Sequence, residues 1–169
     1  NAGGCKNTFN RPNYIHVNTF KANFTTPDNS VCFGTAASFT DASDAGVVSW
    51  VWDFGDLTTS SIQNPSRNYA SSGNYTVSLT AVNGIGCSDT KTVTNFISVL
   101  DLPIVTIQAN NTSSCTVPFL VNFSNNTPNA TSWVWNFGDG TPTSPTQNPA
   151  HSFTAEGEYT VSLQVTDNN

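Results

Sequence analysis

The chain has 169 residues, of which only 9% are charged, and its formal net charge at pH 7 is -6. With five Lys and Arg residues in total, it lacks the basic surface that nucleic-acid binding or attraction to anionic lipid requires. No apolar run approaches the roughly 20 residues of a membrane-spanning helix, so we expect no direct membrane insertion. The first residues lack a signal-peptide pattern and the chain has no Met, as expected of an interior piece of a longer protein.

The first segment resembles the end of a repeat. The stretch GGCKNTFNRPNYIHV, from Gly3, matches IGCSDTKTVTNFISV, from Ile85, about 82 positions later. We therefore predict that residues 1–17 are the last strand of a preceding repeat. Residues 18–100 would then form the first complete repeat.

Apolar and polar residues alternate within residues 18–100. Trp50, Trp52 and Phe54 share one parity, and the same period of two runs from Tyr75 through YTVSLTA. Strict alternation predicts strands with one buried face and one wet face. Antiparallel sheets tolerate that arrangement, whereas parallel sheets rarely do. Turn signals such as ASSG and NGIG separate the predicted strands.

The third repeat, predicted in residues 101–169, restates the second. Its SWVWNFGDG, from Ser132, matches SWVWDFGD, from Ser49, so all four Trp residues lie in two copies of one motif. Its NPAHSFTAEGEYTVSLQ likewise matches NPSRNYASSGNYTVSLT. No counterpart of the last strand follows, so we predict that this sandwich lacks its own.

The turn after the Trp motif differs between the copies. Asp139-Gly140 signals a two-residue hairpin, because Gly adopts positive φ at no steric cost. Leu57 stands where Gly140 stands in the other copy, and Leu resists positive φ. The sequence therefore does not predict the same turn in the first copy.

Several short strands with frequent turns predict an all-β protein of antiparallel sandwiches. A buried Trp on the third strand and a Tyr at the start of the sixth are hallmarks of immunoglobulin-like sandwiches. Each copy needs its own aromatic plug, since one Trp or Phe buries about 150–250 Å². The predicted core residues are Trp52, Phe54, Tyr75, Trp135, Phe137 and Tyr159.

WVWDFGD and WVWNFGDG, each followed by NP…Y…GxYTVSL or its close variant, resemble the signature of polycystic-kidney-disease (PKD) domains. The resemblance covers both main repeats and, weakly, the first 17 residues. It implies two tandem immunoglobulin-like (PKD-type) antiparallel β-sandwiches. Such domains mostly serve as extracellular spacers, stalks or adhesive modules, and some accompany glycan-degrading enzymes. The Cys placement is similar to that in large surface proteins of gliding bacteria, with a gliding-motility adhesin of the SprB type as one candidate parent.

The four Cys residues occupy two repeat-equivalent positions and match no zinc motif. Disulfides in an oxidising compartment are preferred over reduced structural thiols. Cys5–Cys32 with Cys87–Cys115 pairs every Cys and is the preferred connectivity, although an ordinary sandwich would place those turns at distant ends. Cys32–Cys87, within one repeat, stays open as the alternative.

A sandwich without an edge strand exposes unpaired backbone groups. We therefore expect residues 6–17 to fill such a gap, either in their own molecule or in a neighbour. A structure in which residues 6–17 pair with no sheet would contradict this expectation.

No catalytic site is predicted, and the segment is expected not to be an enzyme. Neither His16 nor His151 recurs at the matching position of another repeat, and no Gly-x-Ser-x-Gly nucleophile motif is present. Asp53 and Asp56 are a conceivable carboxylate pair for glycoside hydrolysis, but solvation and turn chemistry explain them.

No cofactor is expected, with calcium at Asp41 and Asp44 as a minor option. The repeat in residues 101–169 fills that acidic loop with Asn125 and Asn126, and a solvated turn is the preferred interpretation.

Carbohydrate sites need exposed aromatic faces, and Trp50 and Trp133 are the only candidate platforms. Their shared parity with Trp52 and Trp135 favours core packing instead.

The sequence thus predicts a non-catalytic repeat segment of an extracellular cell-surface protein, acting as a spacer, stalk or adhesion module. Expected partners are neighbouring repeats of the same chain, then surface polysaccharide or another cell-surface protein, but not nucleic acid. The alternative is an accessory polysaccharide-binding module of a secreted glycan-degrading enzyme.

Overall fold

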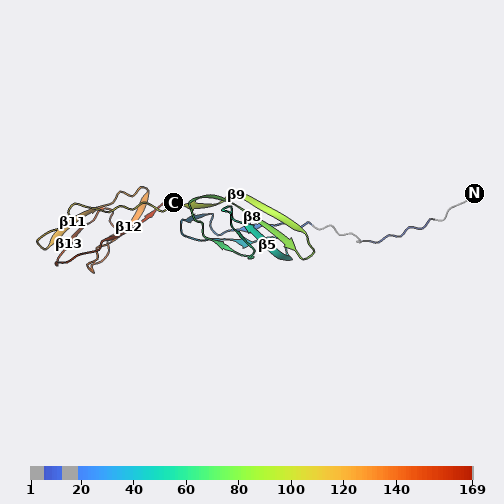
Figure 1. The fold of residues 1–169 in the computed structure, drawn as a ribbon, viewed down its shortest axis with the longest axis horizontal. Coiled ribbons are helices and arrows are strands. Elements are labelled where there is room, and N and C mark those ends of the chain that lie inside the picture. Colours follow the sequence, from blue (N-terminus) through green and yellow to red (C-terminus); the bar gives the residue numbers. More distant parts are fainter. Residues whose placement is uncertain (1–5, 13–18, 169) are drawn as a thin grey trace, which may run out of the picture. The chain divides into compact units, whose positions relative to one another are not determined.

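The computed structural model describes residues 6–12 and 19–168, and these residues contain fourteen β-strands (Figure 1). The strands are β1 (Phe24–Thr25), β2 (Ser30–Cys32), β3 (Ala37–Ser38), β4 (Thr40–Asp41), β5 (Val47–Asp53), β6 (Thr59–Ser60), β7 (Ser66–Arg67), β8 (Gly73–Asn83), β9 (Ser88–Leu100), β10 (Gln108–Ala109), β11 (Phe119–Ser124), β12 (Ala130–Asn136), β13 (Ala150–Phe153) and β14 (Ser162–Asp167). In this described part, no helix is long and apolar enough to cross a bilayer.

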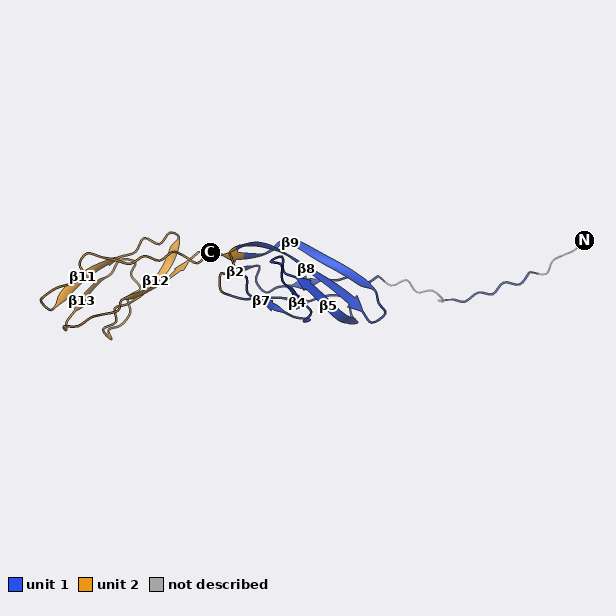
Figure 2. Cartoon of the chain, viewed as in Figure 1, with its two compact units in different colours: residues 1–31, 35–69, 73–98 blue, residues 32–34, 70–72, 99–169 orange. Residues whose placement is uncertain are grey.

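Two compact units divide the chain (Figure 2). Unit 1 takes the described residues within 1–31, 35–69 and 73–98, and unit 2 takes those within 32–34, 70–72 and 99–169. Strands β1–β9 therefore build unit 1, apart from the last residues of β2 and β9, and β10–β14 build unit 2.

The large sheet of unit 1 has five strands in the order β2-β9-β8-β5-β6. The antiparallel pairing of β5 with β8 places Trp52 opposite Leu79. Two short ladders, β1–β4 and β3–β7, supply the rest of the sandwich. Phe24 on β1 and Phe39 beside β3 bring their ring centroids within 5.3 and 5.6 Å of the Trp52 ring. Trp52 has no exposed surface, so it plugs the core of this unit.

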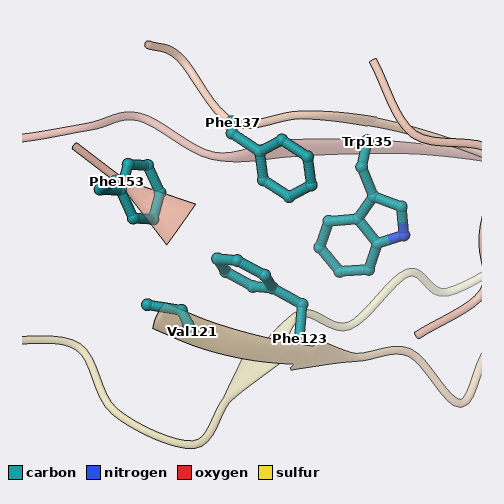
Figure 3. Close-up of a cluster of buried hydrophobic side chains, with 5 residues drawn as sticks. All are labelled: Val121, Phe123, Trp135, Phe137 and Phe153. Carbon is teal, nitrogen blue, oxygen red and sulfur yellow. The ribbon is translucent and has the colours of Figure 1, made fainter. Parts of the chain in front are cut away.

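Unit 2 repeats the plan with fewer strands. One sheet has the order β10-β11-β13, and the other pairs β12 with β14, with Trp135 opposite Leu163. Figure 3 shows Val121 and Phe123 on β11 projecting toward Trp135 and Phe137. Trp135, like its counterpart in unit 1, is fully buried. The all-β fold of two tandem antiparallel sandwiches is therefore confirmed.

The turn after the Trp motif is longer than predicted. In unit 1 a loop of residues 54–58 joins β5 to β6, where Asp53 pairs with Thr59. In unit 2 the bridge after the motif joins Trp135 to Ser144, so the two-residue hairpin predicted at Asp139-Gly140 is wrong. Leu57 nevertheless adopts φ 68°, close to the 81° of Gly140. The Leu side chain is fully exposed, so only the backbone carries the cost of this conformation.

The predicted strand in residues 1–17 falls largely outside the described residues. Residues 6–12 are described; they form no strand and are exposed. The expectation that residues 6–12 add to a sheet of their own molecule is therefore not met. Residues 1–5 and 13–18 lie outside the described part, and the domain boundaries at 17 and 100 stay predictions.

Candidate functional site

Trp50, the candidate carbohydrate platform of unit 1, is half-buried and held by a loop. Its Nε1 donates to Asp41 Oδ2 at 2.7 Å, and Gln63 Nε2 donates to the same oxygen at 3.3 Å. Asp41 Oδ1 accepts the Ser43 N–H at 3.0 Å, while the Asp41 N–H donates to Asn64 Oδ1 at 2.9 Å. The polar edge of the indole therefore fastens the loop to the sheet.

The candidate calcium ligands, Asp41 and Asp44, both accept hydrogen bonds from the protein itself. Burial acts to raise the pKa of Asp41, but hydrogen bonds from Ser43, Trp50 and Gln63 outweigh it and leave the pKa below its ordinary value. Asp44 Oδ2 accepts the Lys21 N–H at 2.8 Å. Within residues 6–12 and 19–168, no three His, Cys, Asp or Glu side chains gather as a metal-ligand set.

In unit 2 an equivalent hydrogen-bond network surrounds the side-chain amide of Asn125. Trp133 Nε1 donates to Asn125 Oδ1 at 3.1 Å, and the Asn125 N–H donates to Asn148 Oδ1 at 2.9 Å. Gln147 Nε2 adds a bond to Asn125 O at 3.2 Å, and Asn125 Nδ2 donates to Thr127 Oγ1 at 2.9 Å. A neutral amide thus replaces the carboxylate with the same indole contact. The position serves the fold and does not require a charge.

Asp53 and Asp56, the conceivable carboxylate pair, are both used in the turn. Asp53 Oδ1 accepts the Gly55 N–H at 2.9 Å, and Asp56 Oδ1 accepts the N–H and hydroxyl of Thr58. Asp56 Oδ2 lies 2.7 Å from Arg67 Nε. Burial acts to raise the pKa of Asp56, but Thr58 and Arg67 hold the pKa below its usual value. A glycosidase acid needs a raised pKa, so this arrangement does not suit that chemistry.

His151 takes the place of the arginine in unit 2. Its Nε2 lies 2.7 Å from Asp139 Oδ2, and its ring stacks on Phe137 with centroids 3.9 Å apart. Asp139 Oδ1 also accepts the Thr141 N–H at 3.1 Å and its hydroxyl at 2.6 Å. The hydroxyl bond from Thr141 has the largest effect on the pKa of Asp139. Burial opposes it, but the bond from His151 and the Thr141 N–H bond add to the lowering, so the pKa falls to about 2. The other histidine, His16, lies outside the described residues.

Tyr75 and Tyr159 are half-buried, so their predicted place in the core is corrected. The Tyr159 hydroxyl donates to Ala155 O at 2.9 Å, and its ring stacks on Phe153 at 4.5 Å. Tyr75 stacks on Tyr69 at 4.0 Å, and it is Tyr69 that is buried. The tyrosines therefore cover the end of the core while their edges reach solvent. The sequence did not single out Tyr69, although it follows the NP turn at the position of Phe153.

The described cysteines are not bonded to one another. No disulfide joins any two of Cys32, Cys87 and Cys115, so the predicted Cys87–Cys115 and Cys32–Cys87 bridges are absent. Cys5 lies outside the described residues, and a Cys5–Cys32 bridge stays a prediction.

The Cys32–Cys87 alternative fails for a geometric reason. Cys87 directly precedes β9, and Phe33, the neighbour of Cys32, donates its N–H to Leu100 O at the other end of that strand. A strand of 13 residues is about 40 Å long, whereas a disulfide needs Cα atoms within about 7 Å.

Two stretches of the chain match known proteins. A family model described as PKD domain matches residues 20–99 and again residues 101–169. A microbial collagenase of Vibrio alginolyticus is 44% identical over 54 residues, which is 32% of this chain and 7% of the collagenase. The pre-pro-metalloprotease PrtV of Vibrio cholerae serotype O1 is 44% identical over 48 residues, 28% of this chain and 5% of PrtV. The chain therefore spans only a small part of these relatives.

Solved PKD domains cover about one repeat. The PKD1 domain of Vibrio anguillarum Epp is 35% identical and covers 47% of this chain and 93% of that domain, with a TM-score of 0.40. The PKD1 domain of the Vibrio cholerae metalloprotease PrtV is 31% identical and covers 47% and 95%, with a TM-score of 0.41. The two family-model matches together span nearly the whole chain, which therefore belongs to the PKD domain family.

Proposed function

We propose that the chain is a non-catalytic spacer segment of an extracellular protein, in which tandem PKD sandwiches hold other parts of the molecule apart. The observation that carries this proposal is that both units use their motif side chains for the fold. The indole N–H groups of Trp50 and Trp133 bond to loop side chains, and Asp56 and Asp139 bond to turn residues and a basic partner. These groups are therefore occupied before any ligand is considered.

The arrangement along the chain also supports a spacer. The family matches at residues 20–99 and 101–169 nearly abut, which leaves almost no linker between the domains. Short connections that contain a Pro, here Pro103, restrict a joint more than Gly- or Ser-rich tethers do. We place such a segment in the stalk of a cell-surface adhesin, including one that serves gliding motility. Its first partners would be neighbouring repeats.

A second candidate function is an accessory binding module of a secreted hydrolase. The similarity to segments of a Vibrio collagenase and of the metalloprotease PrtV favours this candidate. It also widens the expected ligand from polysaccharide to an insoluble protein substrate such as collagen.

Retention on insoluble material separates the two functions. The purified chain is passed over cellulose, chitin and collagen fibrils, with an inert protein of similar charge as reference. A spacer is expected to elute with the reference. Retention that Trp50→Ala or Trp133→Ala removes, while Val51→Ala on the exposed face of β5 keeps it, would refute the spacer and establish a binding module. Thermal unfolding of each variant shows whether a loss is due to misfolding.

A further inference from the structure

The chain enters and leaves its first sandwich, built from β1–β9, at opposite ends of β9. The Ala22 N–H donates to Asp89 Oδ2 at 2.9 Å, which holds the entering chain beside the start of β9. The chain leaves this sandwich at Leu100, the last residue of β9. A strand of 13 residues is about 40 Å long, so tension on the chain acts on the first sandwich along β9.

β2, an early strand of the same sandwich, is a neighbour of β9 in the large sheet. The Ser98 N–H donates to Asn29 O at 2.7 Å, and the Phe33 N–H donates to Leu100 O at 2.8 Å. The residue numbers rise together along the two strands, whereas in an antiparallel pair one would fall as the other rises. β2 and β9 are therefore parallel, and Ser98 lies opposite Ser30.

Parallel strands at the two ends of a sandwich are loaded in shear. Tension pulls β2 toward its first residue and β9 toward its last, so the two strands are drawn in opposite directions along their common length. The backbone hydrogen bonds of the pair then bear the load together. Strands that are pulled apart sideways lose their bonds one after another, each at a smaller force.

We propose that the β2–β9 pair is a mechanical clamp, whose opening limits the unfolding of the first sandwich under tension. Its use rests on the proposed spacer function, since a spacer that holds parts of a protein apart transmits any tension between them. Ile97 and Val99 of β9 are buried, so one face of the clamp is shielded from water that would compete for its bonds. β1 pairs with β4 through two residues only, and that shorter pair opens before the clamp.

The turn after β2 offers a way to remove one bond of the clamp. Gly34 has φ 87°, which suits the third residue of a type II turn, and proline is common at the second position of that turn. Phe33→Pro therefore removes the N–H that donates to Leu100 O and remains compatible with the turn. The Phe33 side chain is 42% exposed, and Phe33→Ala removes it while it keeps the N–H.

Single-molecule stretching of the full chain between its termini tests the proposal. At a fixed force, the first sandwich should unfold about two- to tenfold faster in Phe33→Pro than in Phe33→Ala, the factor that one backbone hydrogen bond contributes. The unfolding event of β10–β14 should stay unchanged and serves as the internal reference.

Asn64→Ala controls for general stability. It removes the bond of 2.9 Å from the Asp41 N–H to Asn64 Oδ1, which lies outside the clamp. The variant should unfold at a lower denaturant concentration than the unaltered chain, because a hydrogen bond is lost. Its unfolding rate under force should nevertheless equal that of the unaltered chain.

A double variant tests the clamp without removing a backbone bond, and it decides the question if Phe33→Pro does not fold. Neither Ser30 nor Ser98 is buried, and Ser30→His with Ser98→His places two imidazoles side by side across β2 and β9. Two imidazoles can bind one Ni²⁺ ion, which stabilises the paired state. Added Ni²⁺ should slow unfolding under force by about tenfold or more, and a chelator should reverse this effect.

Three results would overturn the clamp. The first is an equal unfolding rate of Phe33→Pro and Phe33→Ala under force. The second is an Asn64→Ala variant that unfolds under force as fast as Phe33→Pro, because general stability would then set the rate. The third is Ni²⁺ that protects the double variant against denaturant but not against force. None of these results bears on retention by insoluble material, so the clamp can fail while the spacer function stands.

Discussion

Leu57→Gly is expected to stabilise unit 1, against the usual rule that a loop glycine weakens a protein. Leu57 adopts φ 68° and its side chain is fully exposed, so the substitution removes no packing. A left-handed conformation costs a residue with a Cβ about 1–2 kcal/mol. Glycine loses more backbone entropy on folding, which costs about 0.5–1 kcal/mol. The net gain is about 0.5–1 kcal/mol, or about 2–8 °C in the Tm of a domain of this size.

Calorimetry of the full chain measures this gain, and two variants control it. Leu57→Ala keeps the Cβ and therefore the left-handed cost, so its Tm should stay near that of the unaltered protein. Gly140→Leu makes the reverse change at the equivalent position, φ 81°, and should destabilise unit 2 by a similar amount. If Leu57→Gly is no more stable than Leu57→Ala, the turn does not store backbone strain and the reasoning is wrong.

Three further outcomes follow from unit 2. Gly138→Ala places a Cβ 2.4 Å from Thr160 O and should lower the free energy of unfolding, measured with denaturant, by about 2 kcal/mol or more. Gly140→Ala meets no atom within 4 Å and should lower it by less. Equal losses of stability in the two variants would contradict the contact with Thr160. Because the pKa of Asp139 is about 2 when folded, below the ordinary 3.8, its contribution is full above about pH 4 and is lost as pH falls toward 2. Asp139→Asn should therefore flatten the fall in Tm between pH 4 and 2, and an unchanged slope would count against the pair. Asn125→Ala removes a buried amide side chain and should lower the free energy of unfolding by about 1–3 kcal/mol. A change under about 0.5 kcal/mol would show that the hydrogen bonds of Asn125 do not stabilise unit 2.

Period-two alternation was enough to identify the sheet and the plug residues, because parity decides which face a side chain joins. Trp52 and Trp135 are each the next-to-last residue of their strand and are fully buried. The alternation does not show how deeply an inward-facing side chain is buried. Tyr75 and Tyr159 share the inward parity, but Tyr75 lies near the start of β8 and Tyr159 precedes β14, and both are half-buried.

The polar fastenings could not be read from the sequence in the same way. Asp41 and Trp50 are nine positions apart, and their contact depends on how β4 and β5 are placed in three dimensions. The sequence left a solvated turn, the preferred interpretation, and a calcium site as uses of the Asp41 carboxylate, and it did not indicate the bond to Trp50. The substitution of Asn125 for Asp41 was visible in the sequence, and it was the signal that charge is not needed there. The sequence left the Cys32–Cys87 pairing open as an alternative, since nothing in the spacing showed that β9 runs for 13 residues.

The two units form an internal comparison of one motif, because β9 covers the core of unit 1 and the described residues of unit 2 contain no counterpart of β9. Trp135 stays fully buried in unit 2, so the plug is held by β11 and β12 and does not need the last strand. Val161 and Leu163 do need it, since they lose the cover that β9 gives to their counterparts. In unit 1, β9 therefore covers one side of a core, whereas in unit 2 the contacts of β11 and β12 with Trp135 already bury the indole.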